Sequence, residues 1–90
     1  MEKEKYVVVL DFMISELKLS GAQLLIYAII YGFSQTKDQE FTGSLGYLEH
    51  WTNSSKQSVI NNLKALLDKN LIIKTETVKN GVKFCSYRAK

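Results

Sequence analysis

The stretch SSKQSVINNLKALLDKNLI, residues 54–72, combines two patterns. Its apolar residues recur at the spacing of a helix, with Val59, Leu63 and Leu66 on one stripe. Its first turn consists instead of Ser, Lys and Gln, and a pair of asparagines follows. Ser and Asn are poor helix formers, because their side chains compete for nearby backbone hydrogen bonds. The sequence therefore predicts an amphipathic helix over residues 55–69 whose polar start serves something other than helix stability.

The polar side of this helix has the chemistry of a DNA-contacting surface. In helical projection, Gln57, Asn61 and Lys64 lie opposite the apolar stripe. Gln and Asn can form two hydrogen bonds to adenine in the major groove, and Lys suits guanine or phosphate. The serines, the lysine and the free backbone N–H groups of the first turn suit phosphate. The candidate DNA-binding residues of the helix are Ser55, Lys56, Gln57, Ser58, Asn61 and Lys64.

Residues 71–88 predict a β-hairpin directly after the helix, and Asn70 before them tolerates the left-handed conformation that ends many helices. Two runs rich in β-branched residues, 71–78 and 82–88, flank Asn80-Gly81, and their imperfect alternation leaves the register open. Asn-Gly is the strongest short-range signal for a two-residue type I′ turn. Basic residues on or beside this turn could contact DNA phosphates. The candidate DNA-binding residues of the hairpin are Lys79, Asn80, Lys83 and Arg88.

A further helix is predicted over residues 20–33. Ser20 and Gln23 have the spacing of a capping box at its start. The helix is apolar almost all the way round, which is unusual for a helix at a surface. Two explanations remain open: either the helix is central and covered on most sides, or part of it, including Ile26 and Ile30, forms a subunit interface.

The segment between these helices is expected to hold a polar loop over residues 34–40, a minimal strand over 40–42 and a helix over 44–51. Ser44 is the expected cap of that helix. One face of the helix carries Leu45, Leu48 and Trp51. A polar break over residues 52–54 then leads into the next helix.

Residues 1–19 are expected to form an N-terminal arm. The β-branched run over residues 6–10 predicts a short strand or an extended segment, and Asp11 could cap a brief helical turn after it. An unpaired β-branched strand is a ready template for pairing with another chain. The candidate residues for an oligomer interface are Val7, Val8, Val9, Ile26 and Ile30.

The composition fits one globular domain spanning residues 1–90, with 46% hydrophobic and 23% charged residues. The net charge of +3 is divided unevenly, because residues 1–50 carry −3 and residues 51–90 carry +6. This asymmetry indicates an anionic partner for the C-terminal part, unless the basic face serves only solubility. The single cysteine, Cys85, fits a reducing compartment, and neither a signal peptide nor a membrane span is apparent. We therefore expect a cytoplasmic protein with no membrane partner.

The sequence contains no recognisable catalytic or metal-binding motif. His50 has no second His or Cys at the spacing of metal ligands. Gly43 and Gly46 lack the strand, the spacing and the Lys of a nucleotide-binding loop. Glu49 beside His50 is better interpreted as a surface pair than as a catalytic pair. We expect no enzymatic activity, no metal and no cofactor.

The expected order of elements is an arm, a helix, a minimal strand, a helix, a tight turn, a helix and a β-hairpin. This is the α+β winged helix-turn-helix arrangement, a three-helix core with a C-terminal hairpin wing. The stretches MISELKLSGAQLLIYAIIYGFSQ (13–35) and FTGSLGYLEHWTNSSKQSVINNLKALLDKNLI (41–72) resemble the N-terminal DNA-binding domain of phage and mobile-element replication proteins of Gram-positive bacteria. The resemblance extends from about Tyr6 to Arg88.

The resemblance implies binding to double-stranded DNA in replication initiation or transcription regulation, with the third helix in the major groove. Residues 55–58 and Asn61 match the start of the recognition helix, and residues 79–83 match the wing. Many relatives have Gly where this chain has Asn70. The alternative is a protein-interaction or oligomerisation module in a replisome or regulatory complex. In that case the apolar helix over residues 20–33 or the arm over residues 6–10 would join subunits or bind a replication or regulatory protein, and any DNA contact would be non-specific.

Overall fold

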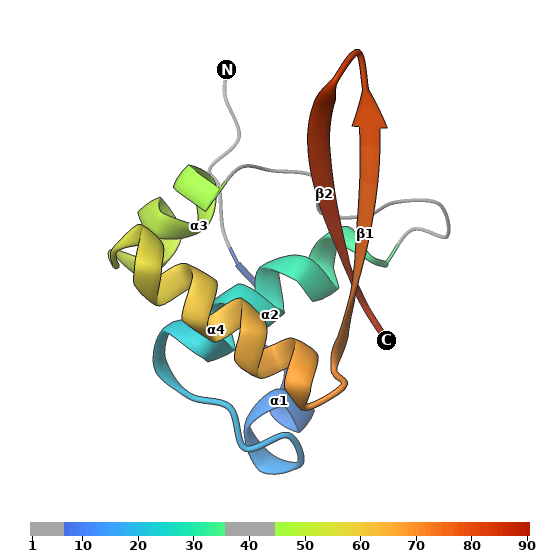
Figure 1. Cartoon of the computed structure of the whole chain (residues 1–90). Coiled ribbons are helices and arrows are strands. Elements are labelled where there is room, and N and C mark those ends of the chain that lie inside the picture. The colour runs from blue at the N-terminus through green and yellow to red at the C-terminus, as the bar shows by residue number, and fades with distance from the viewer. Residues whose placement is uncertain (1–6, 36–44) are drawn as a thin grey trace, which may run out of the picture.

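The computed structural model describes residues 7–35 and 45–90 (Figure 1). The described elements are α1 (Asp11–Ser15), α2 (Gly21–Phe33), α3 (Leu45–Thr52), α4 (Lys56–Asp68), β1 (Ile72–Lys79) and β2 (Val82–Ala89). The two strands form an antiparallel hairpin after the helices. This order confirms the predicted α+β winged helix-turn-helix fold. The bounds of the three longer helices differ from those predicted by no more than one residue at either end.

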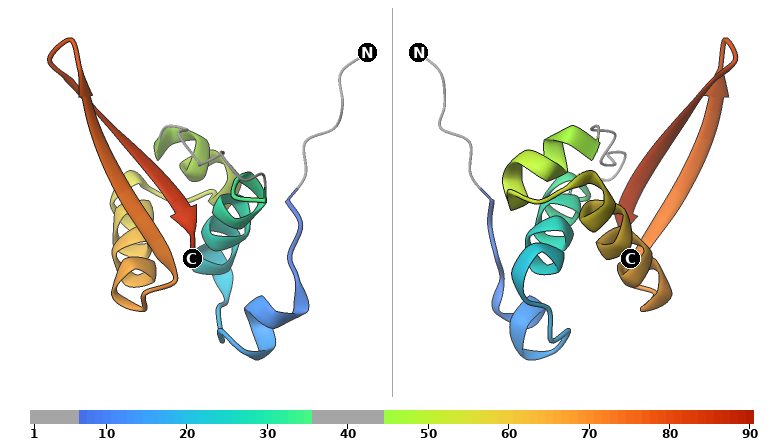
Figure 2. Two further views of the ribbon diagram at one scale, coloured as in Figure 1. Left: turned by 90° about the vertical axis from the view of Figure 1, so that its right-hand side faces the viewer. Right: turned by 60° about the vertical axis from the view of Figure 1, so that its left-hand side comes forward.

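The centre of the fold is α2, which contacts α1, α3, α4 and β2. Figure 2 shows α4 and the hairpin on one side of α2, and residues 7–10 with α1 on the other side. The base of the hairpin lies beside the helices, and the rest of the hairpin projects away from them (Figures 1 and 2). Because neighbours surround α2, its apolar residues are covered in nearly every direction.

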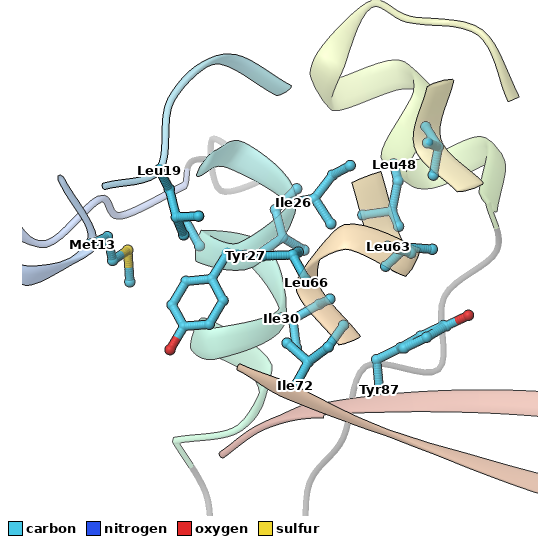
Figure 3. Packing of buried hydrophobic residues seen from close by; sticks show 13 residues of the cluster. Met13, Leu19, Ile26, Tyr27, Ile30, Leu48, Leu63, Leu66, Ile72 and Tyr87 are labelled. Carbon is cyan, nitrogen blue, oxygen red and sulfur yellow. The ribbon is translucent and has the colours of Figure 1, made fainter. Parts of the chain in front are cut away.

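This central position decides between the two explanations for the apolar helix. Ile26 and Ile30 are 0% exposed within a single chain, in a core that also includes Leu48, Leu66 and Ile72 (Figure 3). A side chain that is fully enclosed by its own chain has no surface left for a partner. The prediction of a subunit interface at Ile26 and Ile30 is therefore wrong, and the helix is apolar because it is central.

The apolar stripe of α4 attaches this helix to the core, as its spacing predicts. Val59, Leu63 and Leu66 are all buried in the same cluster. Complete burial of an aliphatic side chain stabilises a fold by about 1.5–3 kcal/mol. The stripe therefore fixes which face of α4 is turned away from the core.

The N-caps of α4 and α2 differ in their hydrogen bonds. Ser55 is the N-cap of α4, and its Oγ accepts a hydrogen bond of 3.2 Å from the Ser58 N–H. Ser20 is the N-cap of α2 but its side chain makes no cap hydrogen bond, so the predicted capping box is wrong. Gly21, the first residue of α2, has a φ of +58°, a left-handed conformation that glycine adopts without steric cost. Gln23 is instead directed at α4, where it contacts Asn62.

The end of α4 follows the prediction. Asn70 has a φ of +63°, the left-handed conformation expected of a helix-terminating Asn. The Asn70 N–H donates to the Leu67 carbonyl at 2.9 Å, and the Leu71 N–H donates to the Leu66 carbonyl at 3.1 Å. These two bonds constitute a Schellman motif, which turns the chain from α4 into β1.

The hairpin turn also follows the prediction, whereas the placement of Arg88 does not. Asn80 and Gly81 have φ values of +52° and +77°, and a type I′ turn requires positive φ at both positions. The register pairs Lys79 with Val82 at the turn and Ile73 with Arg88 near the base. The prediction that Arg88 lies on or beside the turn is wrong, because it occupies the opposite end of an eight-residue strand.

The N-terminal arm is extended instead of forming a described strand. Residues 7–10 have no strand partner among the described residues, and Leu10, not Asp11, is the N-cap of α1. Asp11 is the first helical residue, and its Oδ2 accepts a hydrogen bond of 3.1 Å from the Ser15 hydroxyl. The predicted strand over residues 40–42, most of the polar loop over 34–40 and the Ser44 cap lie outside the described residues.

Candidate nucleic-acid interface

A tight polar turn between α3 and α4 positions the first turn of α4. Asn53 adopts a φ of +51°, and the Ser54 N–H donates to the Glu49 carbonyl at 3.3 Å, which ends α3. The Thr52 hydroxyl donates to the Leu48 carbonyl at 2.7 Å and also lies 2.5 Å from the Ser54 hydroxyl. The polar residues between the helices therefore bond to one another and to the end of α3, and the chain enters α4 at a fixed angle.

The first turn of α4 is exposed and rich in hydrogen-bond donors. Ser55, Lys56 and Gln57 are all exposed, and Ser58 is half-buried. The Ser55 oxygen accepts the cap bond, which leaves its hydroxyl hydrogen as a donor. The first N–H groups of a helix have no intrahelical acceptor, and the helix dipole makes this end favourable to anions. This end of α4 therefore has exposed donors of the kind that bind phosphate, and the predicted phosphate contact stays a prediction.

Gln57 and Asn61 form a side-chain pair on the exposed face of α4. Gln57 Nε2 donates to Asn61 Oδ1 at 3.0 Å, and both residues are exposed. The pair leaves Gln57 Oε1 as an acceptor and Asn61 Nδ2 as a donor toward solvent. In the major groove, adenine presents an acceptor at N7 and a donor at N6. The two outward groups match that edge.

The two adjacent asparagines of α4 have different surroundings. Asn61 is exposed, whereas Asn62 is half-buried and donates from Nδ2 to the Ser58 carbonyl at 3.0 Å. Asn62 Oδ1 accepts a hydrogen bond of 3.5 Å from Gln23 of α2. Asn62 therefore joins α4 to α2, and only Asn61 is available to a ligand. Lys64, nearly one helical turn after Asn61, is also exposed.

The outer half of the hairpin carries lysines on an exposed ribbon. Lys79 and Asn80 are exposed at the turn, and Lys83 follows on β2. The ammonium group of Lys83 lies 3.3 Å from one carboxylate oxygen of Glu76, and that of Lys74 lies 3.3 Å from the other. Hydrogen bonds from Lys83 and then Lys74 hold the pKa of Glu76 below its ordinary value. The bond to Glu76 is in turn the main reason that the pKa of Lys74 is raised.

The sequence alone does not identify Lys74 and Glu76 as functional candidates. The available signal was the alternation of β1, because Lys74 and Glu76 share a strand face. Without a register, nothing in the sequence places Lys83 of the other strand on that same face. Val78 shares the strand face of Lys74 and Glu76, and the register pairs Val78 with Lys83, so Lys83 lies on that face as well.

The structure brings most of the predicted residues to one side of the molecule. The exposed start of α4 and the projecting hairpin lie on the same side of α2 (Figure 2). Arg88 is an exception, since it is half-buried at the base of the hairpin. Lys69 and Lys90 lie near the other end of α4, where Lys69 donates to Gln23 at 2.8 Å and Lys90 bonds to Asn70.

Over residues 7–35 and 45–90, no helix has the length and apolar character needed to cross a membrane. The same residues contain no group of three or more His, Cys, Asp or Glu side chains that could hold a metal ion.

Comparison with protein families gives one finding. A family model described as a helix-turn-helix domain matches residues 17–72, which include α2, α3 and α4 and end at the first residue of β1. No curated protein and no solved structure matches the chain.

Proposed function

This chain belongs to the helix-turn-helix domain family, and from this membership we propose that it binds double-stranded DNA, with α4 in the major groove and the hairpin as a wing. The observation that supports the proposal most strongly is that α4 has one buried apolar face and one exposed polar face. Its apolar stripe is buried, while Gln57 and Asn61 are exposed and paired at the start of the helix. Recognition helices of helix-turn-helix domains place their N-terminal residues against base edges.

The proposed contacts fall into two classes. Phosphates are contacted by Ser55, Lys56 and Ser58 at the start of α4 and by Lys79 and Lys83 of the hairpin. These contacts fix the register of the protein on the duplex but read no sequence. Gln57 and Asn61 contact base edges, and Lys64 contacts guanine or phosphate. The charge of +6 over residues 51–90 provides the electrostatic attraction to the duplex.

We infer further that this binding serves replication initiation or transcription regulation. The resemblance of residues 13–35 and 41–72 to replication proteins of phages and mobile elements supports the first role. Both roles require recognition of a particular site, and so both require base-edge contacts from α4.

Selection of bound sequences from a random duplex pool, at a stated salt concentration, tests the proposal directly. We expect enrichment of a short motif that contains adenine where Gln57 and Asn61 meet the bases. Binding without enrichment would restrict the function to non-specific contacts with phosphates. An absence of duplex binding at low salt would refute the proposal.

Lys79 at the hairpin turn offers a test of the phosphate contacts. K79Q should weaken binding to all duplex sequences and reduce the slope of log K against log salt by about one, because one fewer counterion is released. The matched control is K18Q, since Lys18 is exposed between α1 and α2, away from α4. Affinities of both variants for a random duplex, measured over a range of salt, give the slopes. Equal slopes for K79Q and K18Q would exclude a phosphate contact at Lys79.

A second candidate function, oligomerisation through the N-terminal arm, is favoured by exposed apolar side chains. Val8 is 54% exposed and Ile14 is 52% exposed, and the neighbouring Val9 and Leu10 are exposed as well. Val7 packs against the core and holds the arm close to it. Residues 7–10 and α1 lie on the side of α2 away from α4, so that a second copy bound there would leave α4 free (Figure 2).

Sedimentation of the wild type and a Val8→Lys variant tests this second candidate. A homodimer formed through the arm should dissociate in the variant, because a lysine placed in an apolar contact is costly. Duplex binding per chain should be retained in the variant. A wild type that is monomeric at all accessible concentrations would rule out a homodimer.

A further inference from the structure

One face of the hairpin carries an ion-pair cluster, and the proposed function uses only Lys83 of its three residues. Ile72 of β1 and Tyr87 of β2 are buried, and strand alternation places every second residue from them on the same face. This inner face therefore also presents Lys74, Glu76 and Lys83. Both lysines pair with Glu76, and no other acid occurs among the residues of β1 and β2.

The geometry of the cluster resembles an occupied anion site. One oxygen of the Glu76 carboxylate lies 3.3 Å from the Lys74 ammonium of β1. The other oxygen lies 3.3 Å from the Lys83 ammonium of β2. A phosphodiester also presents two charged oxygens, and lysines bind it as point charges. The side chains are partly exposed, at 36% for Lys74, 44% for Glu76 and 60% for Lys83. Exposed ion pairs contribute little to stability, so a phosphate could displace the carboxylate at small cost.

We propose that Lys74 and Lys83 form a phosphate-binding site on the inner face of the hairpin, and that Glu76 occupies this site when DNA is absent. The inference rests on the proposed function and extends it, because it adds Lys74 as a contact and Glu76 as an internal competitor for the duplex. Glu76 then lowers affinity for all sequences alike. The base contacts of α4 therefore contribute a larger share of the total binding free energy.

The first experiment compares E76Q with E16Q on a random duplex over a range of salt. Both variants remove one negative charge, and Glu16 is the exposed C-cap residue of α1, on the side away from α4. E76Q should bind roughly threefold to tenfold more tightly than the wild type at about 0.1 M salt, with a salt slope steeper by about one to two. E16Q should leave the slope unchanged.

A double-mutant cycle separates release of the two lysines from simple loss of repulsion. In the K74Q/K83Q background, E76Q should have little effect on affinity or on the salt slope, because no lysine remains to be released. If E76Q strengthens binding equally in both backgrounds, Glu76 acts only by repulsion and the masked site is refuted. If the wild type binds no duplex at low salt, the proposed function itself fails, and the inference fails with it. The two failures are therefore distinguishable.

Discussion

Replacement of Ile30 by alanine is expected to lower the free energy of unfolding by about 2–5 kcal/mol. Ile30 is 0% exposed on α2, in the same buried cluster as Leu66 of α4 and Ile72 of β1 (Figure 3). Truncation removes apolar contacts at the meeting point of three elements and leaves a cavity that the surrounding backbone can fill only in part. Urea denaturation followed by circular dichroism measures the change. A small domain has only about 5–15 kcal/mol of stability, so this loss is a large share of it.

The matched control is Ile14→Ala, which makes the same chemical change on a side chain that is 52% exposed. Its effect should be well below that of Ile30→Ala, because a half-exposed side chain leaves no enclosed cavity. Equal losses for the two variants would contradict the described packing of α2. If the loss of unfolding free energy in Ile30→Ala depends on protein concentration, Ile30 would instead belong to a subunit interface.

The sequence predicts α4 and the hairpin well because their signals are local. The spacing of Val59, Leu63 and Leu66 identifies the buried stripe, and Asn80-Gly81 identifies the turn, without knowledge of any distant residue. Asn70 is similar, because a left-handed residue at a helix end needs only its own side chain and the preceding turn. Each of these predictions concerns residues within a few positions of one another.

Two of the wrong predictions depend on residues that are distant in sequence. Gln23 fits a capping box by its spacing but contacts Asn62 and Lys69 of a helix that follows much later in the chain. The apolar surface of α2 fits a subunit interface equally well until the positions of α4 and β2 are known. Tertiary contacts decide these two cases. Arg88 is a different case, because its separation from Gly81 along an extended strand already places it far from the turn.

Replacement of Asn61 by alanine is expected to weaken binding to the preferred duplex by about 1–3 kcal/mol, with little change on unrelated sequences. The substitution removes the outward Nδ2 donor and also the acceptor that holds Gln57 in place. Gln57 must then be ordered on the duplex at an entropic cost, so both members of the pair lose effectiveness. Affinities for the selected duplex and for a scrambled duplex, at the same salt concentration, measure the difference.

The neighbouring Asn62 supplies the control for this experiment, because it has the same side chain at the next position. Asn62 bonds to the Ser58 carbonyl and to Gln23, so Asn62→Ala should lower the stability of the domain by about 1 kcal/mol. It should leave the ratio of affinities for selected and scrambled duplexes unchanged. The opposite pattern, with specificity lost at Asn62 and retained at Asn61, would mean that α4 presents a different face to DNA. A ratio that neither substitution changes would mean that the polar face of α4 contacts water and not bases.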